Sequence, residues 1–134
     1  NYDISVVATT NIVSAMQKNG IHRYIGQAGA WGTEFTEDAS PLMRLGFIIF
    51  WPLRQIYAFK KIEDSIVKKS SLDWTLVRCG ILTNKEAAPI TVAPARYRCK
   101  VLEIPKISRK SVAQFHLSII DDSTYYRSAP IIFN

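Results

Sequence analysis

The chain begins with an apolar pattern of helical period. Positions three or four residues apart share one side of a helix, so the pattern predicts a helix with an apolar face. Its members are Ile4, Val7, Ala8, Ile12, Ala15 and Met16. Asn19-Gly20 is a helix stop, because glycine readily adopts the left-handed conformation that ends a helix. A β-prone run at residues 22–27 predicts a strand, which makes a helix–strand unit.

The next segment is harder to assign. Residues 28–40 contain small and then polar residues and are predicted to form a loop. Ser40-Pro41 is a helix-start signal, with serine as the cap and proline in the first turn. Residues 42–50 are strongly apolar and fit either a helix or a buried strand. Pro52 either breaks this segment or begins the next element.

The second half predicts two further helices and three strands. Residues 56–69 have apolar positions at helical spacing with lysines on the other side. The run at residues 73–79 is β-prone and is predicted to be a central strand. Gly80 and Asn84 mark a loop. Further elements are a strand at 97–104 closed by Pro105, a helix at 108–120 capped by Ser108, a turn at 121–123 and a strand at 129–133. This alternation predicts one α/β domain over residues 1–134 with a mainly parallel, partial Rossmann-like sheet.

The composition is that of a folded protein with an excess of basic residues. Hydrophobic residues make up 48% of 134 positions and charged residues 21%, which suits one globular domain and excludes a disordered chain. The formal net charge is +6, but the basic residues are scattered, and the densest groups are pairs such as Lys60-Lys61 and Lys68-Lys69. Because nucleic-acid binding needs clustered positive charge, we expect no nucleic-acid partner.

Cysteine usage and apolar runs indicate a cytoplasmic protein. Cys79 and Cys99 lie in apolar surroundings without metal-ligand spacing, so the sequence predicts buried free thiols and no metal site. Free thiols suit a reducing compartment. No signal peptide is recognised, and the longest apolar stretch, residues 45–53, is far shorter than the ~20 residues of a membrane span. We therefore expect no membrane partner; the alternative is that residues 47–51 touch a membrane or another subunit.

A Tyr-x-x-x-Lys pair is the first candidate for chemistry. Tyr57 and Lys61 are four residues apart on the predicted second helix and so share one face. An ammonium near a phenol lowers the phenol's pKa and suits it to proton transfer. The alternative is an amphipathic helix with a solvated lysine, because this spacing often arises by chance.

Small residues at two predicted strand ends are the second candidate. In doubly wound folds, ligands bind beyond the carboxyl ends of the strands. Gln27-Ala28-Gly29-Ala30 ends the first strand, where small residues let a flat ring approach the backbone; the alternative is a simple tight turn. Arg78-Cys79-Gly80 ends the second strong strand. Arg78 is a candidate contact for a phosphate or a carboxamide, or a partner for an acid.

No glycine-rich phosphate turn occurs in the 134 residues. Neither Gly-x-Gly-x-x-Gly nor Gly-x-x-Gly-x-x-Gly is present, and no strand precedes the first predicted helix. Such a turn holds a dinucleotide's pyrophosphate at a helix N-terminus. By itself, the chain is therefore predicted to have no high-affinity dinucleotide site.

Three segments resemble one family. Residues 10–16 with 20–25 resemble the helix and strand before the active-site loop of NmrA-like, atypical short-chain dehydrogenases, a group that includes flavin reductase/biliverdin reductase B. Residues 71–80, SLDWTLVRCG preceded by serine, resemble the family's "SGLDWTIVRPG", which is the most specific match. Residues 107–113 resemble its "ISR-x-DVA" helix start. The matches occur in family order and span nearly the whole chain, which resembles the C-terminal half of the family domain.

The resemblance implies an NAD(P)-binding Rossmann-like fold with redox activity on a small carbonyl, flavin or quinone-like substrate. The family's helix lysine maps to Lys60, because Asp64, four residues later, stands at the family's usual glutamate position. Tyr57 lies three residues before Lys60. In the alternative register, the lysine is Lys61. Catalytic roles are thus implied for Tyr57 and Lys60 or Lys61. The implied cofactor-binding residues are Ala28, Gly29, Ala30, Lys60, Arg78, Cys79, Gly80, Ile81 and Leu82.

Two departures from the family pattern bear on activity. Ala28-Gly29-Ala30 stands where the family has a serine or threonine, and Cys79 replaces the usual proline.

The residues that distinguish NADH from NADPH lie in a part of the fold that these segments do not match. The missing front half of the domain would also leave the strand at residues 22–27 as an open sheet edge, available for oligomerisation.

Three functional hypotheses follow from the sequence. The first is an NAD(P)-dependent oxidoreductase seen in part, which would bind a dinucleotide and a small-molecule substrate. The second is a non-catalytic truncated paralogue that acts as a binding or regulatory partner. The third is a basic interaction module that uses residues 47–51.

Overall fold

The computed structural model describes residues 3–29, 51–93 and 105–134. The helices and strands alternate along the chain, as an α/β protein requires. They are α1 (Asp3–Lys18), β1 (Arg23–Gly29), α4 (Trp51–Lys69), β2 (Asp73–Cys79), β3 (Ile81–Thr83), β4 (Thr91–Val92), β5 (Lys106–Ser108), α5 (Arg109–Ser118), the 3-10 helix η1 (Ser123–Tyr125) and β6 (Ile131–Phe133).

A four-stranded sheet with the order β1-β2-β6-β4 forms the centre of the molecule. β1 and β2 run parallel along their whole lengths, and β6 is parallel to the carboxyl half of β2. β4 is antiparallel to β6, and β3 and β5 form a separate parallel pair. The predicted α/β class with a mainly parallel sheet is therefore confirmed.

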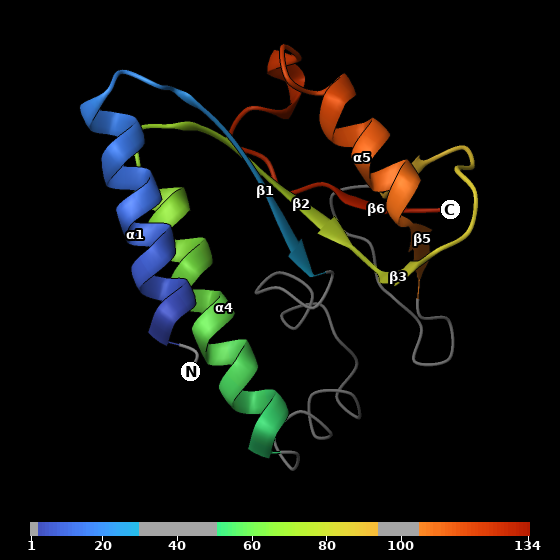
Figure 1. Cartoon of the computed structure of the whole chain (residues 1–134), viewed down its shortest axis with the longest axis horizontal. Coiled ribbons are helices and arrows are strands. Elements are labelled where there is room, and N and C mark those ends of the chain that lie inside the picture. Colours follow the sequence, from blue (N-terminus) through green and yellow to red (C-terminus); the bar gives the residue numbers. More distant parts are fainter. Residues whose placement is uncertain (1–2, 30–50, 94–104) are drawn as a thin grey trace.

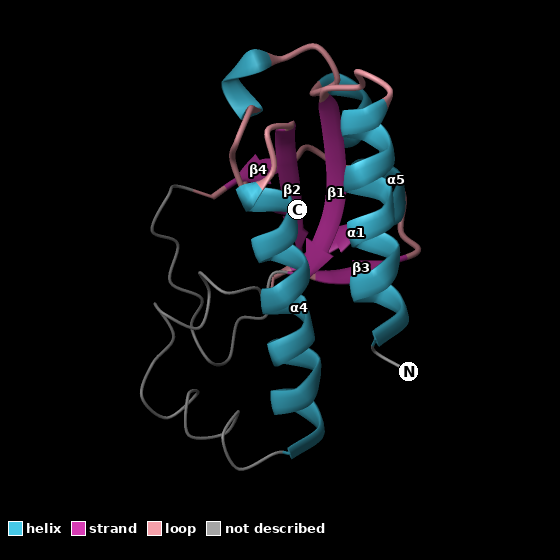
Figure 2. Cartoon of the chain, turned by 90° about the vertical axis from the view of Figure 1, so that its left-hand side faces the viewer, coloured by secondary structure: helices cyan, strands magenta, loops and turns pink. Residues whose placement is uncertain are grey.

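Helices cover both faces of this sheet (Figures 1 and 2). On β2, Trp74 and Leu76 pack with Val13 of α1 and Val67 of α4. The alternate residues of β2 point to the opposite face, because successive strand side chains alternate. On that face Val77 and Cys79 pack with Ile107, Val112, Phe115, Ile119 and Ile132. β2 is thus buried on both faces, which confirms its prediction as a central strand.

Several predicted boundaries are confirmed. Gly20 follows α1 with a φ of +67°, the left-handed conformation expected of a helix stop. Ser108 caps α5: its side-chain oxygen accepts a hydrogen bond of 3.0 Å from the backbone N of Ser111. No helix within the three described ranges is long and apolar enough to cross a membrane.

Other boundaries differ from the prediction. β1 continues through Gly29, two residues into the predicted loop, because its pairing with β2 extends to the end of that strand. α4 starts at Trp51, so Pro52 lies in its first turn, where a missing N–H costs no helical bond. β3 occupies part of the loop predicted after Gly80. The predicted elements at residues 42–50 and 97–104, and the patch at 47–51, lie outside the described residues.

The predicted apolar face of α1 is the largest disagreement. Ile4, Val7 and Ile12 are 65%, 56% and 50% exposed, although their spacing predicts a buried face. The helix instead packs against α4 and the sheet through Val13 and Met16. The helix is therefore correctly predicted, but its apolar face has no partner among the described residues.

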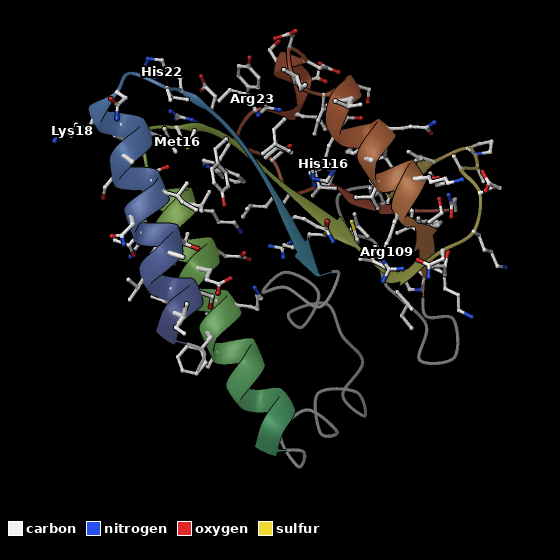
Figure 3. All side chains as sticks on the ribbon, viewed as in Figure 1. Met16, Lys18, His22, Arg23, Arg109 and His116 are labelled. Carbon is white, nitrogen blue, oxygen red and sulfur yellow. The ribbon has the colours of Figure 1, made fainter. Side chains whose placement is uncertain are left out.

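Two residues allow or make contacts between elements that are distant in the sequence. A side chain at Gly80 would bring its Cβ within 2.0 Å of the Pro105 carbonyl oxygen, so only glycine allows β3 to start beside β5. Arg23 is the first residue of β1, and its side chain reaches the C-terminal end of α5 (Figure 3). Its guanidinium donates to the carbonyl oxygens of Ile119 and Ile120 at 2.7 and 2.9 Å.

Candidate functional site

The carboxyl ends of β1 and β2 lie side by side. Ala28 pairs with Arg78, and Gly29 pairs with Cys79, in the parallel register. Ligands of open α/β sheets bind beyond this edge. The structure thus brings together four of the residues singled out in the sequence, while Ala30 lies outside the described residues.

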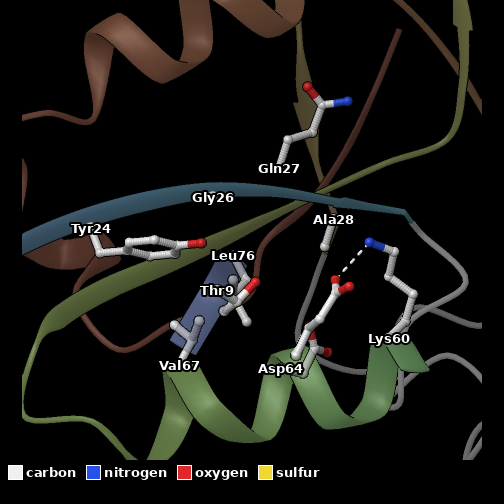
Figure 4. Close-up of a pocket in the computed structure, with 10 residues that line it drawn as sticks. Thr9, Tyr24, Gly26, Gln27, Ala28, Lys60, Asp64, Val67 and Leu76 are labelled. Atoms are coloured by element: carbon white, nitrogen blue, oxygen red, sulfur yellow. Dashed lines mark hydrogen bonds and ion pairs between the residues drawn. The ribbon is translucent and has the colours of Figure 1, made fainter. Parts of the chain in front are cut away.

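A small cavity opens between α1, β1 and α4 next to this edge (Figure 4). Its volume is about 40 Å³, whereas ligand pockets usually have ~300–1,000 Å³. The cavity is therefore too small for a dinucleotide, but it brings titratable side chains of α4 to the end of β1. It is lined by Thr9, Tyr24, Gly26, Gln27, Ala28, Lys60, Glu63, Asp64, Val67 and Leu76.

Lys60 is the lysine that lies at the strand end. Figure 4 shows its side chain reaching from α4 toward Ala28. Its Nζ lies 2.7 Å from Oε2 of Glu63, and the lysine side chain is 49% exposed while that of Glu63 is 13% exposed. The partly buried Glu63 carboxylate holds the ammonium in position, and the ammonium stays accessible to solvent. Lys61 is exposed and does not line the cavity, and the Tyr57 side chain lies outside the described part of α4.

Arg78 forms a buried ion pair below this edge. Its Nη2 lies 2.7 Å from Oδ2 of Asp64, and the two side chains are 0% and 7% exposed. Of the roles considered for Arg78, pairing with an acid is the one observed. Because the Arg78 side chain is fully buried, its guanidinium is not exposed at the strand end.

Tyr24 is a site residue that the sequence did not reveal. Its ring lies beneath β1 in the cavity, and it fits because Gly26 has no side chain: a Cβ there would stand 2.8 Å from the Tyr24 ring. Burial raises the pKa of the Tyr24 phenol, and the carboxylates of Glu63 and Asp64 raise it further. The phenol therefore stays protonated near neutral pH. The available signal was the aromatic-x-glycine spacing, which places both residues on one face of a strand.

The three residues after β2 extend the same edge. Gly80 allows the tight approach to Pro105 described above, and Ile81 is 44% exposed. Leu82 is partly buried against the hydrophobic cluster under α5. Within the described ranges, no three His, Cys, Asp or Glu side chains are placed to hold a metal ion.

We expect the Cys79 thiol to resist alkylation in the folded protein. Burial raises its pKa to about 11, from 9.0 for an ordinary thiol. At pH 8 only about one buried thiol in a thousand is ionised, against about one in ten for an exposed thiol. Iodoacetamide labelling of the Cys99→Ser variant at pH 8 should therefore be at least about tenfold slower in buffer than in urea.

The same shift sets the direction of a pH effect. The unfolded thiol ionises near pH 9, whereas the folded thiol ionises near pH 11. The unfolded state therefore loses its proton first, and this contribution to the free energy of unfolding falls as the pH rises from about 9 to about 11. In the iodoacetamide experiment described above, equal labelling rates in buffer and in urea would contradict the burial of Cys79.

Several solved structures have the same fold as this chain. A protein of Bacillus halodurans, provisionally an NAD-dependent epimerase/dehydratase, is 24% identical with a TM-score of 0.75; the match covers 100% of this chain and 58% of that protein. A short-chain dehydrogenase/reductase of Veillonella parvula in complex with NADP is 18% identical with a TM-score of 0.73, covering 96% and 58%. An anaerobilin reductase of Escherichia coli is 17% identical with a TM-score of 0.76, covering 96% and 58%.

These structures show the fold, which is Rossmann-like as the sequence predicts, and this chain spans about three fifths of their length. No curated protein matches the chain by sequence. The profile of the NAD(P)H-binding family matches residues 3–123, which is most of the 134-residue chain. The chain therefore belongs to the NAD(P)H-binding family.

Proposed function

We propose that this chain forms the nicotinamide end of an NAD(P)-dependent oxidoreductase of the atypical short-chain dehydrogenase type. The observation that carries the proposal is the position of Lys60. Its half-exposed ammonium stands beside Ala28 at the carboxyl end of β1, which is where sheets of this class bind dinucleotides. An NADP complex of a structural neighbour supports the same cofactor class.

The residues at the strand end suit the sugar and ring of a nicotinamide nucleotide. The Lys60 ammonium would donate hydrogen bonds to ribose hydroxyls, with Glu63 holding it in position. Ala28 and Gly29 have no bulky side chain, so a flat ring can approach the β1 backbone. NADH or NADPH would supply the hydride. By resemblance, we propose a small carbonyl, flavin or quinone-like compound as the substrate.

The pyrophosphate must be held by another part of the protein or by another chain. The 134 residues contain no glycine-rich phosphate turn, and that turn supplies the N–H groups that bind the pyrophosphate. We therefore propose that these residues act as the C-terminal half of a complete domain. We place the protein in the cytoplasm, because the buried Cys79 thiol suits a reducing compartment.

A second candidate is a non-catalytic relative that binds or regulates a partner. It is favoured by the chemistry of the strand end, where Ala28 and Gly29 offer neither a hydroxyl nor an acid for proton transfer. The Arg78 guanidinium, moreover, is committed to Asp64. In this case the Lys60–Glu63 pair is a structural remnant of a cofactor site.

Two adjacent lysines allow a matched test of the first candidate. NADPH and NADH are titrated calorimetrically into the 134-residue chain and into its Lys60→Ala and Lys61→Ala variants. We expect weak binding by the unaltered chain, because the phosphate turn is absent. Lys60→Ala should weaken binding by about tenfold or more, the value of a hydrogen bond to a charged group, and Lys61→Ala by less than about twofold.

The outcomes test the assignment of Lys60 to the cofactor site. Equal losses in both lysine variants would mean that the cofactor is held by general positive charge and would overturn the site assignment. No heat of binding at millimolar cofactor would mean that these 134 residues form no cofactor site without the glycine-rich turn. The unfolding temperature of each variant confirms that the protein is folded in the titration.

A further inference from the structure

Basic side chains that are scattered in the sequence gather around the strand pair β3 and β5. Four of them are exposed there: Lys85, Lys106, Arg109 and Lys110. Residues 80–93 and 105–118, which include this strand pair and its flanks, contain a single acid, Glu86. Four basic residues and one acid give these stretches a net charge of +3, half of the +6 of the whole chain.

Three of the four charges have no acidic partner among the described residues. The Lys110 ammonium is paired with Glu86, at 2.6 and 2.7 Å from the two carboxylate oxygens. Arg109 donates through Nη1 to the side-chain oxygen of Asn84 at 2.6 Å, and this neutral acceptor leaves the positive charge uncompensated. The other two lysines make no ion pair within the described ranges.

Lys106 shares an exposed face of the strand pair with Ile81. The two residues are partners in the parallel register of β3 and β5, about 4.8 Å apart. Ile107 is fully buried under α5, so Lys106 points to the opposite face, because successive strand side chains alternate. Arg109 follows Lys106 by three residues, at most ~10 Å of chain, which two long side chains can span. Figure 3 shows Arg109 close to β3.

The stability of α5 does not account for the basic residues at its start. The first turn of a helix favours acidic residues, because its free N–H groups carry partial positive charge. The first turn of α5 contains no acid, whereas Arg109 and Lys110 are its first two residues. The helix end and the side chains therefore both attract negative charge to the same surface. We call this surface, formed by Ile81, Lys85, Lys106 and Arg109, the β3–β5 basic surface.

The β3–β5 basic surface begins where the proposed cofactor site ends. β3 starts two residues after Cys79, and Cys79 pairs with Gly29 at the end of β1. Ligands of open α/β sheets bind beyond these strand ends. β5 lies on the β6 side of β2, where the backbone N of Asn134 donates to the Lys106 oxygen at 3.0 Å. The exposure of this surface therefore does not depend on the outer edge of β1, which lies on the other side of β2.

We propose that the β3–β5 basic surface binds an anionic group of the substrate, a carboxylate or a phosphate. This proposal rests on the proposed function, because it names the substrate class of that site. Arg109 keeps its Nε and Nη2 donors for the anion, since Asn84 occupies only Nη1. Lys106 adds a second positive charge, and the half-exposed Ile81 contacts the apolar body of the substrate.

The size of the surface favours a small molecule over a macromolecule. Membrane surfaces and nucleic acids are bound by larger clusters or stripes of basic residues. Three uncompensated charges beside a strand end match one anionic group of a small substrate instead. The surface thus selects, within the proposed class of carbonyl or quinone-like compounds, those that carry a negative charge.

Three small probes with a common phenyl ring test the surface: benzoate, phenyl phosphate and benzyl alcohol. Each is titrated into the isotope-labelled 134-residue chain at constant ionic strength, and the backbone amide NMR shifts are followed. We expect both anions to shift the amides of residues 81–86 and 106–110. Benzyl alcohol, which has no charge, should bind there at least about fivefold more weakly. The anion that binds more tightly identifies the natural group as a carboxylate or a phosphate.

Two variants remove the same charge at different places. Arg109→Gln changes the β3–β5 basic surface, whereas Lys69→Gln changes the far end of α4 (Figure 1). Arg109→Gln should weaken benzoate binding by at least about fivefold, the value of a hydrogen bond to a charged group at an exposed site. Lys69→Gln should weaken it by less than about twofold. Lys106→Gln is a second variant of the surface and should also weaken binding. The amide spectrum of each variant shows that it is folded.

Three results would overturn the proposal. Equal losses in Arg109→Gln and Lys69→Gln would mean that net charge alone attracts the anion. Equal binding of benzoate and benzyl alcohol would mean that the ring alone is bound. Shifts of the same amides by NADPH would assign the surface to the phosphates of the cofactor. Lys60 is not part of the surface, so failure of the proposed cofactor site would appear in the Lys60→Ala titration and leave benzoate binding unchanged.

Discussion

Replacing Asp64 by alanine is expected to lower the free energy of unfolding by about 3–5 kcal/mol, the usual cost of removing one partner of a buried ion pair. The pair joins α4 to the carboxyl half of β2, with 2.7 Å between Oδ2 of Asp64 and Nη2 of Arg78. Arg78 is 0% exposed, so its charge cannot be hydrated when the carboxylate is removed. Domains of this kind have stabilities of about 5–15 kcal/mol, so this loss is a large fraction of the total.

A surface ion pair of similar length provides the control. Nζ of Lys110 lies 2.6 Å from Oε1 of Glu86, but these side chains are 58% and 85% exposed. Glu86→Ala should therefore cost less than about 1 kcal/mol. Urea denaturation of both variants gives the two values. Similar values for Asp64→Ala and Glu86→Ala would contradict the assignment of the Asp64–Arg78 pair as a buried, structural interaction.

A double variant, Asp64→Ala with Arg78→Met, tests the cause of the lower stability. The two possible causes are the loss of the ion-pair attraction and the burial of the Arg78 charge without Asp64. Asp64→Ala leaves the Arg78 guanidinium in a buried position without this carboxylate. Adding Arg78→Met replaces that charge by an apolar side chain of similar length. If most of the loss comes from burying a charge, the double variant is more stable than Asp64→Ala alone, because buried pairs can often be replaced by apolar residues at little cost.

The sequence predicts those parts of the fold that depend on local chemistry. Gly20 ends α1 because of its conformational freedom, and Ser108 caps α5 through its own side chain. β2 is recognisable because its sequence, DWTLVRC, is rich in β-prone residues, which suits a strand buried on both faces. The short β3 is missed, since its pairing with β5 is a contact between distant residues that no local pattern records.

The candidate site is only partly predictable from the sequence, because it also depends on contacts between residues that are distant in the chain. The Tyr-x-x-x-Lys spacing singles out Lys61, whereas the resemblance singles out Lys60. The direction of α4 relative to β1 decides which lysine reaches Ala28, and that direction is set by tertiary packing. Tyr24 enters the site only because Gly26 leaves space for its ring. The apolar spacing of α1 likewise predicts that Ile12 is buried, whereas its side chain is 50% exposed.

Arg23 is expected to be the second most sensitive position tested, although it is a charged residue at the start of an edge strand. The last carbonyl groups of a helix have no partner within the helix. Arg23 supplies one to α5: its Nη2 and Nε donate to Ile119 and Ile120. Its Nη1 donates to the Asp73 carbonyl and to the Thr75 hydroxyl, both at 2.8 Å. One side chain thus ties β1, β2 and α5 together.

Arg23→Ala should lower the free energy of unfolding by about 3 kcal/mol, because three carbonyl oxygens and a hydroxyl lose a charged donor together. Arg23→Lys should recover only part of this loss, since an ammonium lacks the planar fork of donors that reaches several acceptors at once. Arg109, which is exposed and donates one 2.6 Å hydrogen bond to Asn84, is the matched control. Its alanine variant should lose less than about 1 kcal/mol in urea denaturation. If Arg23→Ala lost no more than Arg109→Ala, the fastening of α5 would have to come from hydrophobic packing around Phe115 and Ile119 alone.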